Sequence, residues 1–385
     1  MLPPSSDDAG TGSINLGELQ FAESPVGPVQ IDPKELVKHV GIFATTGSGK
    51  TNTGFHITLQ LLRHKIPFLI IDWKRSYRSL KSLEPTPKFE VFTVGRNTRP
   101  FLWNPLRPPP KTHIRTWITI LSEVLEKSHI SGQGVADVLI EHIDNAFERR
   151  GFFADDTKSF PNFSDVRESV ERVSYKGRRQ LWQDSCLRIL RSFTYGPAAA
   201  AFNNRNPIKL EEVLCQSTIL ELDQELPKSL RIFLSEVIFR WIHLYRLGQG
   251  EISSLRHVLI LEEVHNLFPR SSIELQANNG LENIFREIRS FGQGMIAITQ
   301  HPSLLPVFLL GNLHCLIFMS LTHEADIAAA RQALFLERNQ SHFLDLLRVG
   351  EGIVKIKGRV PAVHVRFPKI AVSAGSVTDE DLMRK

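Results

Sequence analysis

The stretch that decides the fold of this chain is Val40-Gly-Ile-Phe-Ala-Thr-Thr-Gly-Ser-Gly-Lys-Thr51. It opens with a short apolar run, continues as a glycine-rich turn, and enters a helical stretch that runs from about Lys50 to His64. The turn meets the pattern G-x-x-x-x-G-K-[ST] except that Ala44 stands in place of the first glycine. In such a turn, backbone N–H groups and the N-terminus of the helix surround phosphate groups. Residues 44–51, here called the phosphate loop, therefore predict a nucleotide site.

The residues of the phosphate loop have different expected roles in binding ATP and Mg²⁺. Lys50 should reach the β- and γ-phosphates, and the hydroxyl of Thr51 should ligate Mg²⁺. Ala44 is tolerable if its φ is negative, because only the two later glycines need unusual dihedrals. The residues expected to contact the nucleotide are Thr46, Gly47, Ser48, Gly49, Lys50, Thr51 and Asn52. The alternative, a glycine-rich turn without a ligand, is disfavoured by the Lys50-Thr51 pair and by the flanking strand and helix.

The apolar runs on both sides of the loop predict an α/β fold with a mostly parallel central sheet. Phe68 to Asp72 follows the first helix, and two strands joined by a helix of this length form a right-handed crossover. Further short apolar runs without alternation are typical of buried parallel strands. They are Glu90 to Val94, Thr218 to Leu222, His257 to Leu261, Met295 to Thr299 and Cys315 to Ser320. Gly352 to Lys357 and Ala362 to Phe367 are expected to form an antiparallel hairpin.

The chain is predicted to consist of a core, an insertion and two tails. Its 385 residues, 42% of them hydrophobic, suffice for a sizeable core and exclude a fibrous or disordered protein. Between the third and fourth expected strands, apolar residues recur at helical spacing, which predicts a helical insertion. The predicted parts are a tail of residues 1–34 with at most one strand (Ile14 to Phe21), a core of 35–99 and 213–368, an insertion of 100–212, and a polar tail of 369–385.

Two carboxylates follow the apolar run Val258 to Leu261. A nucleotide hydrolase needs one carboxylate for the water shell of Mg²⁺ and another to polarise the attacking water. Glu262 is expected near the metal, and Glu263 is expected to act as the base. A pair of acids at a strand end is equally often a surface pair, so this assignment depends on the phosphate loop.

Three further polar residues precede or follow the run Met295 to Thr299. Arg286 and Arg289 are three positions apart, and either could stabilise γ-phosphate charge as an arginine finger from a neighbouring subunit. Gln300 stands at the end of the run, where an amide that senses the γ-phosphate is expected. The alternatives are solvent-exposed helix arginines and a capping glutamine.

The positive charge of the chain is concentrated in two places. The sequence has 46 Lys and Arg residues against 41 Asp and Glu, a net charge of +5. The first basic stretch, Val91 to Ser122, has no carboxylate; the second basic stretch, Lys176 to Lys209, has only Asp184. Their basic residues are Arg96, Arg99, Arg107, Lys111 and Arg115 in the first and Lys176, Arg178, Arg179, Arg188, Arg191, Arg205 and Lys209 in the second. Solvated helix faces are one interpretation, and surfaces for nucleic-acid phosphates are the other.

Cysteine usage and hydropathy point to a cytoplasmic protein. Cys186, Cys215 and Cys315 are far apart and follow no metal-binding spacing, which fits a reducing compartment. No apolar leader follows Met1, and the most apolar stretch, Leu304 to Met319, is too interrupted to cross a membrane.

Taken in order, these motifs resemble the HerA/FtsK superfamily of P-loop motor ATPases, most closely its HerA-like branch. The resemblance covers residues 35 to 368 and rests on His39–Thr51, Leu261–Asn266, Arg286–Gly292 and Thr299–Ser303, with support from Ile219–Asp223 and Gly350–Val354. It implies a RecA-like fold and a homohexameric ring that uses ATP and Mg²⁺ to move double-stranded DNA through its channel. It also implies an ATP site between subunits and a separately encoded nuclease or other effector, in DNA processing or phage defence. In this branch a glutamate at the metal position, as at Glu262, is usual.

The chain differs from that family in two respects. Relatives generally have an N-terminal β-barrel, for which the residues before the core are too few, and the predicted insertion matches no family motif. Asp72 to Tyr77 occupies the place of an Asp-containing turn, where Lys74 or Arg75 could face the nucleotide or DNA. The other functions considered are a nucleotide-switched ring scaffold that activates an effector, a genome-packaging motor, and a coupling ATPase at a secretion pore. The last is disfavoured because no membrane anchor is expected.

Overall fold

The computed structural model describes residues 12–132, 134–153, 159–204, 207–268, 279–359, 362–373 and 375–383. Its chain divides into two compact units. The first comprises Met1–Glu90, Leu214–Ile219 and Gly250–Asp381, and the second Val91–Val213, Leu220–Gln249 and Leu382–Lys385. The second unit thus contains the expected insertion, 100–212, and extends beyond it to 91–99 and 220–249. Arg205 of the second basic stretch and residues 1–11 of the expected N-terminal tail lie outside the described residues.

The described residues include eleven strands of one sheet, in the order β2-β1-β11-β10-β9-β3-β8-β7-β4-β6-β5. The strands are β1 (Ile14–Phe21), β2 (Ser24–Ile31), β3 (Val40–Phe43), β4 (Phe68–Asp72), β5 (Glu90–Val94), β6 (Thr218–Leu222), β7 (Ile252–Glu262), β8 (Phe291–Thr299), β9 (Cys315–Met319), β10 (Glu351–Ile356) and β11 (Val363–Arg366). The parallel neighbours include β9 with β3, β3 with β8, β8 with β7, and β7 with β4. Every residue of β3, β4, β8 and β9 is buried, as expected for central parallel strands.

All strands predicted for this sheet are present, but β7 and β8 are longer than predicted. β8 begins at Phe291 rather than Met295, because the polar residues that precede Met295 are buried in the sheet. Gln293 is fully buried, and its amide donates to the carbonyl of Gly294. Gly292 has a φ of +72°, and a Cβ there would lie 2.4 Å from the carbonyl oxygen of Ser254. Only glycine fits at that position.

Antiparallel strands complete the sheet beside β9. β10 and β11 form the hairpin that the sequence predicts, and β10 pairs with β9. The N-terminal region corrects the prediction of at most one strand, because β1 and β2 form a hairpin and β1 pairs with β11. The sequence does not predict β2 because it contains Pro25 and Pro28, and proline disrupts an interior strand. They are tolerated because β2 lies at the end of the strand order.

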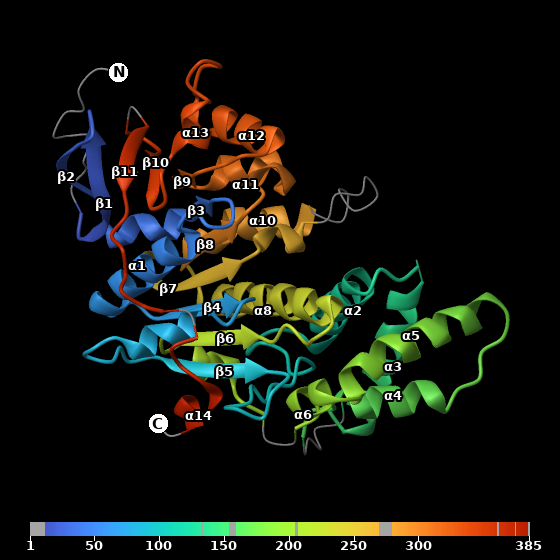
Figure 1. Cartoon of the computed structure of the whole chain (residues 1–385). Coiled ribbons are helices and arrows are strands. Elements are labelled where there is room, and N and C mark those ends of the chain that lie inside the picture. The colour runs from blue at the N-terminus through green and yellow to red at the C-terminus, as the bar shows by residue number, and fades with distance from the viewer. Residues whose placement is uncertain are drawn as a thin grey trace. The chain divides into compact units, whose positions relative to one another are not determined.

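The helices of the first unit begin with the one that follows the phosphate loop (Figure 1). They are α1 (Lys50–Arg63), α10 (Asn279–Glu287), α11 (Val307–Asn312), α12 (Glu324–Leu334), α13 (Phe343–Leu346) and α14 (Asp379–Met383). Short 3-10 helices include η2 (Pro33–Lys38), η3 (Tyr77–Ser82), η4 (Val264–Leu267), η5 (Ile288–Ser290) and η6 (Pro302–Leu304). α14 forms within the region expected to be a polar tail. Its Asp379 accepts hydrogen bonds from Arg75 and from the buried Arg78 at 2.5 Å each.

The second unit is mainly helical, as the sequence predicts for 100–212. Its helices are α2 (Ile114–Ser128), α3 (Val135–Arg149), α4 (Phe163–Glu171), α5 (Arg178–Thr194), α6 (Pro197–Phe202), α7 (Leu210–Val213) and α8 (Lys228–Gln249). α3, α4 and α5 pack against one another, as Figure 1 shows in green. Buried aromatic rings form the core, with Phe193 4.4 Å from Phe163 and 4.8 Å from Phe233 between ring centroids. Among the described helices, none has the length and apolar content needed to cross a bilayer.

Candidate nucleotide-binding and hydrolysis site

The predicted site residues come together because four parallel strands end at the same edge of the sheet. Phe43 of β3 lies opposite Thr299 of β8. Ile71 of β4 lies opposite Leu261 of β7, and β7 is the parallel neighbour of β8. The residues that follow these strands are the phosphate loop after β3, Gln300 after β8, Glu263 after β7, and Trp73-Lys74 after β4. The strand order thus unites polar residues that are far apart in the sequence.

The phosphate loop has the backbone that the motif requires. Gly47 and Gly49 have φ values of +86° and +105°, in the region that favours glycine. A Cβ on Gly49 would lie 3.1 Å from the backbone nitrogen of Gly350, whereas a Cβ on Gly47 would meet nothing within 4 Å. Ala44 is not among the residues with positive φ, so the missing first glycine does not strain the loop.

Hydrogen bonds from β9 and from the turn before β10 hold the phosphate loop in place. The backbone N–H and the hydroxyl of Thr45 both donate to the carbonyl of Ser320, at 3.0 and 2.9 Å. The hydroxyl of Ser48 donates to the carbonyl of Thr45 at 2.6 Å. The N–H of Gly350 donates to the carbonyl of Ser48 at 2.9 Å. These bonds tie the loop to other parts of the fold, and a loop held in this way loses less entropy when it binds a ligand.

Lys50 is buried at the start of α1 and faces the acidic end of β7. Its Nζ lies 3.8 Å from Oε1 of Glu263, and the residue is 7% exposed. Burial lowers the pKa of Lys50 to about 8, and the positive charge of Lys74 acts in the same direction. The negative charges of Glu263 and Glu262 oppose this shift. Lys50 is therefore a cation in low-dielectric surroundings, as a group that binds phosphate should be.

Glu263 is the centre of a hydrogen-bonded cluster. Its Oε1 lies 2.8 Å from Nζ of Lys74 and accepts a hydrogen bond from the Gln300 amide at 3.0 Å. The Gln300 amide oxygen accepts in turn from the hydroxyl of Thr46, at 2.7 Å. Nδ1 of His265 lies 3.5 Å from Oε2 of Glu263. The predicted base and the predicted γ-phosphate sensor are thus in direct contact, and the sensor also contacts the phosphate loop.

The charge and the backbone of Glu263 both suit a catalytic base. Burial alone would raise the pKa of Glu263, but the charge of Lys50 and the hydrogen bonds and charge of Lys74 and Gln300 bring the pKa below its usual value. The side chain is therefore ionised at neutral pH. Its backbone is left-handed, with φ +48° and ψ +41°, a conformation that costs a non-glycine residue about 1–2 kcal/mol. Such strain is typical of functional sites.

Glu262 is buried beside Asp72, a neighbour that the sequence analysis did not select. Burial, followed by the charge and hydrogen bond of Asp72, raises the pKa of Glu262 well above its usual value. The N–H of Trp73 donates to Oε2 of Glu262 at 3.2 Å. Asp72 accepts from the N–H groups of Lys74 and Tyr77, at 2.9 and 3.0 Å, and so shapes the turn that carries Lys74. Asp72 follows an apolar run just as Glu262 does, and this was the signal that could have identified it.

The residues at this edge of the sheet fit a magnesium nucleotide. Within the described part of the chain, no cluster of three or more His, Cys, Asp or Glu side chains could hold a metal alone. Mg²⁺ needs no such cluster, because it usually takes one or two carboxylates, several waters and the phosphates of its nucleotide. Thr51, half-buried in the first turn of α1, and Glu262 offer the predicted ligands. The side chain of Asn52 is bonded instead to the backbone of Pro368 and Ile370, at 2.7 Å each, which leaves its N–H for the nucleotide.

The two predicted finger arginines lie away from the site of their own subunit. Arg286 is exposed in α10 and pairs with Glu282, four residues earlier. Arg289 is exposed in η5, just before β8, whereas Gln300 follows the other end of that strand. Burial lowers the pKa of His39, which precedes β3, to about 4, and the charge of Arg289 acts in the same direction. Within one subunit neither arginine can therefore contact a nucleotide on the phosphate loop.

Comparison with known proteins agrees with the motifs. Residues 14–182 match the family described as "Helicase HerA, central domain". The HerA-like resemblance is thereby confirmed. The probable helicase MJ1565 of Methanocaldococcus jannaschii is 22% identical to this chain over 356 residues. The alignment covers 90% of the chain but only 65% of that curated relative.

Solved structures of the same fold cover nearly all of this chain. VirB4 of Thermoanaerobacter pseudethanolicus has a TM-score of 0.70 at 17% identity, over 94% of this chain and 98% of VirB4. The plasmid coupling protein TrwB, solved with ADP and Mg²⁺, has a TM-score of 0.65 at 12% identity, over 94% of this chain and 91% of TrwB. Identities this low establish the fold alone. They confirm the predicted RecA-like α/β fold.

Proposed function

We propose that this protein is an ATP-hydrolysing DNA translocase or helicase of the HerA type. The observation that carries the proposal is the contact chain from Thr46 through Gln300 to Glu263, beside Lys50. It joins the phosphate loop, a sensing amide and an ionised carboxylate, the groups that phosphoryl transfer to water requires.

The residues of the site have distinct roles in this proposal. Thr51 and Glu262, together with the ATP phosphates, would hold Mg²⁺, which when bound would neutralise charge at the transferring phosphoryl group. Lys50 places a further positive charge against the β- and γ-phosphates. Glu263 takes the proton from the attacking water as the new oxygen–phosphorus bond forms and the bond to the β-phosphate oxygen breaks. Gln300 holds Glu263 and contacts Thr46, so it can respond to the presence of the γ-phosphate.

The placement of Arg286 and Arg289 supports a homo-oligomer. Both lie away from their own phosphate loop, and both are exposed, so either can act only on the site of a neighbouring subunit. A ring in which each subunit supplies a finger to the next meets this need, and we propose a hexamer. Such an arginine stabilises the negative charge that develops on the γ-phosphate and so raises kcat by a factor of roughly 10³–10⁵.

We propose double-stranded DNA as the track and a separately encoded nuclease or other effector as the partner. The match to the HerA helicase family and the net charge of +5 support this. The basic stretches are in part neutralised by acids from elsewhere in the sequence, since Arg179 pairs with Glu141, and Arg115 with Asp144. Arg188 and Arg191, which are exposed in the middle of the second stretch, have no such partner among the described residues.

The test is the rate of ATP hydrolysis with and without duplex DNA, at two salt concentrations, for the wild type and Glu263→Gln. Duplex DNA should accelerate the wild type, and more salt should weaken this effect because phosphate contacts release counterions. Glu263→Gln should bind ATP but turn it over at least about 100-fold more slowly, since general base catalysis is worth roughly 10²–10⁴. An inactive wild type would refute the enzyme. Hydrolysis that DNA does not change at low salt would refute the translocase and favour a nucleotide-switched scaffold.

A further inference from the structure

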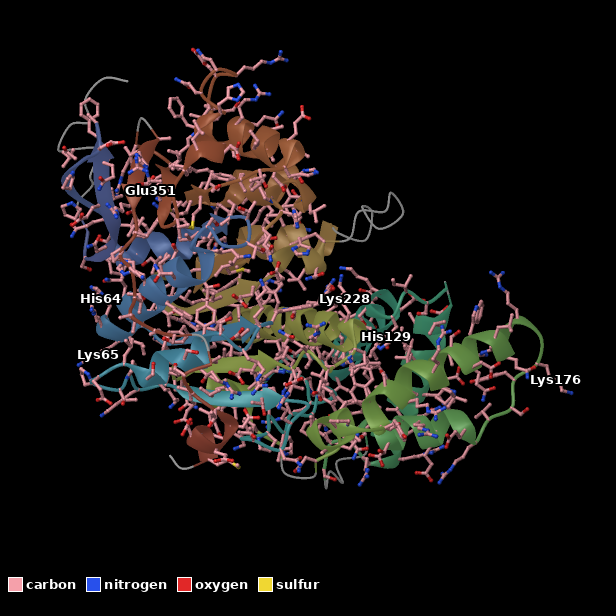
Figure 2. The ribbon with its side chains drawn as sticks, viewed as in Figure 1. His64, Lys65, His129, Lys176, Lys228 and Glu351 are labelled. Atoms are coloured by element: carbon pink, nitrogen blue, oxygen red, sulfur yellow. The ribbon has the colours of Figure 1, made fainter. Side chains whose placement is uncertain are left out.

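The exposed face of α5 carries apolar, aromatic and basic side chains that do not pack in the core of the unit. α5 buries Gln183, Cys186, Ile189, Leu190 and Phe193 on one face. On the opposite face Leu181 is 66% exposed, and Tyr195, just after the helix, is 71% exposed. Arg188 and Arg191 lie between them on the same face, at helical spacing, and are also exposed. Figure 2 shows Lys176 in the loop that leads into this helix.

A pocket opens beside the C-terminal end of this face. Its volume is about 420 Å³, within the range of small-molecule sites. Leu226, Leu230 and Pro197 contribute apolar surface to it. Arg188, Arg191 and Tyr195 line it as well, and the guanidinium carbon of Arg191 lies 5.6 Å from the centroid of the Tyr195 ring. The pocket thus combines an apolar lining, an exposed ring and two positive charges.

The two arginines have no carboxylate partner in the described residues. Other arginines of the same unit do: Arg172 pairs with Glu168, and Arg167 with Glu171. The one acid that lines the pocket, Glu225, has its carboxylate 3.7 Å from Arg96. Arg188 and Arg191 therefore offer positive charge to an external anion.

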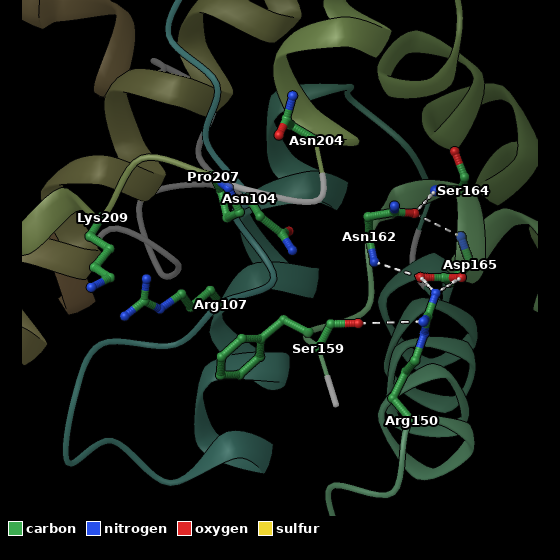
Figure 3. A pocket seen from close by; sticks show the side chains of 11 residues that line it. Asn104, Arg107, Arg150, Ser159, Asn162, Ser164, Asp165, Asn204, Pro207 and Lys209 are labelled. Atoms are coloured by element: carbon green, nitrogen blue, oxygen red, sulfur yellow. Dashed lines mark hydrogen bonds and ion pairs between the residues drawn. The ribbon is translucent and has the colours of Figure 1, made fainter. Parts of the chain in front are cut away.

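A second pocket in this unit shows the opposite arrangement (Figure 3). It is larger, about 950 Å³, and includes Arg150, Arg107 and Lys209. Arg150 donates to both carboxylate oxygens of Asp165, at 2.8 and 3.0 Å, as Figure 3 shows. Arg107 pairs with Glu211, and Lys209 with Glu212. Its cations are already neutralised, so the smaller pocket is the better anion site.

We propose that the exposed face of α5 binds a single strand of nucleic acid, with an unpaired base stacked on Tyr195 and adjacent phosphates on Arg188 and Arg191. The proposal rests on the proposed function, because it assumes that the motor handles nucleic acid. An exposed aromatic ring with flanking arginines is the combination by which proteins bind single strands without sequence preference. The apolar lining of the pocket favours the face of a base, which is accessible in a single strand and hidden in a duplex.

The experiment measures binding of the full-length chain to a fluorescein-labelled dT20 oligonucleotide by anisotropy, with an unlabelled 20-base-pair duplex as competitor. Tyr195→Leu should weaken binding by about fivefold to 150-fold, the measured range for loss of one stacking ring. Tyr195→Phe keeps the ring and should bind as the wild type does. Arg188→Gln with Arg191→Gln should reduce the slope of log K against log salt by about 1.4, or 0.7 for each lost phosphate contact.

Arg172→Gln is the matched control, because it removes an exposed but paired arginine of the same unit. It should leave both affinity and salt slope unchanged, and thermal melting should show that all variants are folded. The proposal is overturned if dT20 fails to bind at low salt, if Tyr195→Leu binds as tightly as Tyr195→Phe, or if Tyr195→Leu weakens binding of the duplex as much as binding of dT20. These results are independent of ATP hydrolysis, so they separate failure of this site from failure of the motor.

Discussion

The contact between Lys74 and Glu263 predicts a measurable shift in the pH dependence of ATP hydrolysis. The two charged atoms are 2.8 Å apart, and the Lys74 side chain is 39% exposed, against 11% for Glu263. At that distance two unit charges attract by about 1.5 kcal/mol at the dielectric constant of water and by about 6 kcal/mol at an effective value of 20. Because solvent screens the exposed lysine, we take the lower value, which corresponds to about one pKa unit.

The sign follows from the charges around Glu263. Lys74 stabilises the carboxylate and so helps to hold the pKa of Glu263 below its usual value, against the effect of burial. Lys74→Met removes that stabilisation, and the pKa of Glu263 should rise. Since the base must be ionised to accept a proton, the acidic limb of kcat/KM should move to higher pH by about one unit.

The assay is a steady-state ATPase profile between pH 4 and 9 for the wild type, Lys74→Met and Lys88→Met. Lys88 is an exposed lysine of the same unit that does not belong to the cluster around Glu263, so its variant controls for the lost charge. An acidic limb that stays in place in Lys74→Met, while the rate at the optimum falls, would show that Lys74 contacts substrate instead. A limb that moves to lower pH would refute the assignment of Glu263 as the base.

Three further outcomes are expected. The alkaline limb of kcat/KM should lie near pH 8, because Lys50 loses its proton as pH rises through its pKa of about 8. Lys50→Arg should move this limb to higher pH. Lys50→Ala should abolish ATP binding measured by calorimetry. Gly49→Ala should weaken ATP binding more than tenfold, because φ of Gly49 is +105° and the new Cβ would meet Gly350. The control is Gly311→Ala, whose Cβ would meet nothing within 4 Å and which should bind ATP as the wild type does. Equal ATP affinity of the two variants would contradict the loop geometry. Arg289→Ala subunits mixed with Glu263→Gln subunits should hydrolyse ATP faster than either variant alone, and an inert mixture would count against a finger supplied by a neighbour.

The sequence was informative wherever function depends on contiguous residues. The phosphate loop is a local motif, and its glycines have the dihedrals that the motif requires. Glu262, Glu263 and Gln300 could be selected because each directly follows an apolar run, and parallel strands bring their ends to one edge of a sheet. The hairpin of β10 and β11 was recognisable from two short runs around a turn.

The rest depends on strand order and on partners that are distant in the sequence. Lys74 meets Glu263 only because β4 lies beside β7, and nothing in the sequence reveals that adjacency. The same adjacency places Asp72 against Glu262. β2 was missed because tolerance of its prolines depends on its place at the end of the strand order. Part of the charge of the two basic stretches is neutralised by acids outside them, since Glu141 pairs with Arg179 and Asp223 with Arg96, and these partners are distant in the sequence.

The position of β3 has a consequence for how the chain folds during synthesis. β3 lies between β8 and β9, both of which leave the ribosome long after it, and the phosphate loop is anchored by Ser320 and Gly350. Until those residues emerge, the phosphate loop lacks the hydrogen bonds that Ser320 and Gly350 provide. Such non-local pairing slows folding and leaves strand edges open to other chains. A nascent chain should therefore acquire nucleotide binding only after Ser320 and Gly350 have left the ribosome.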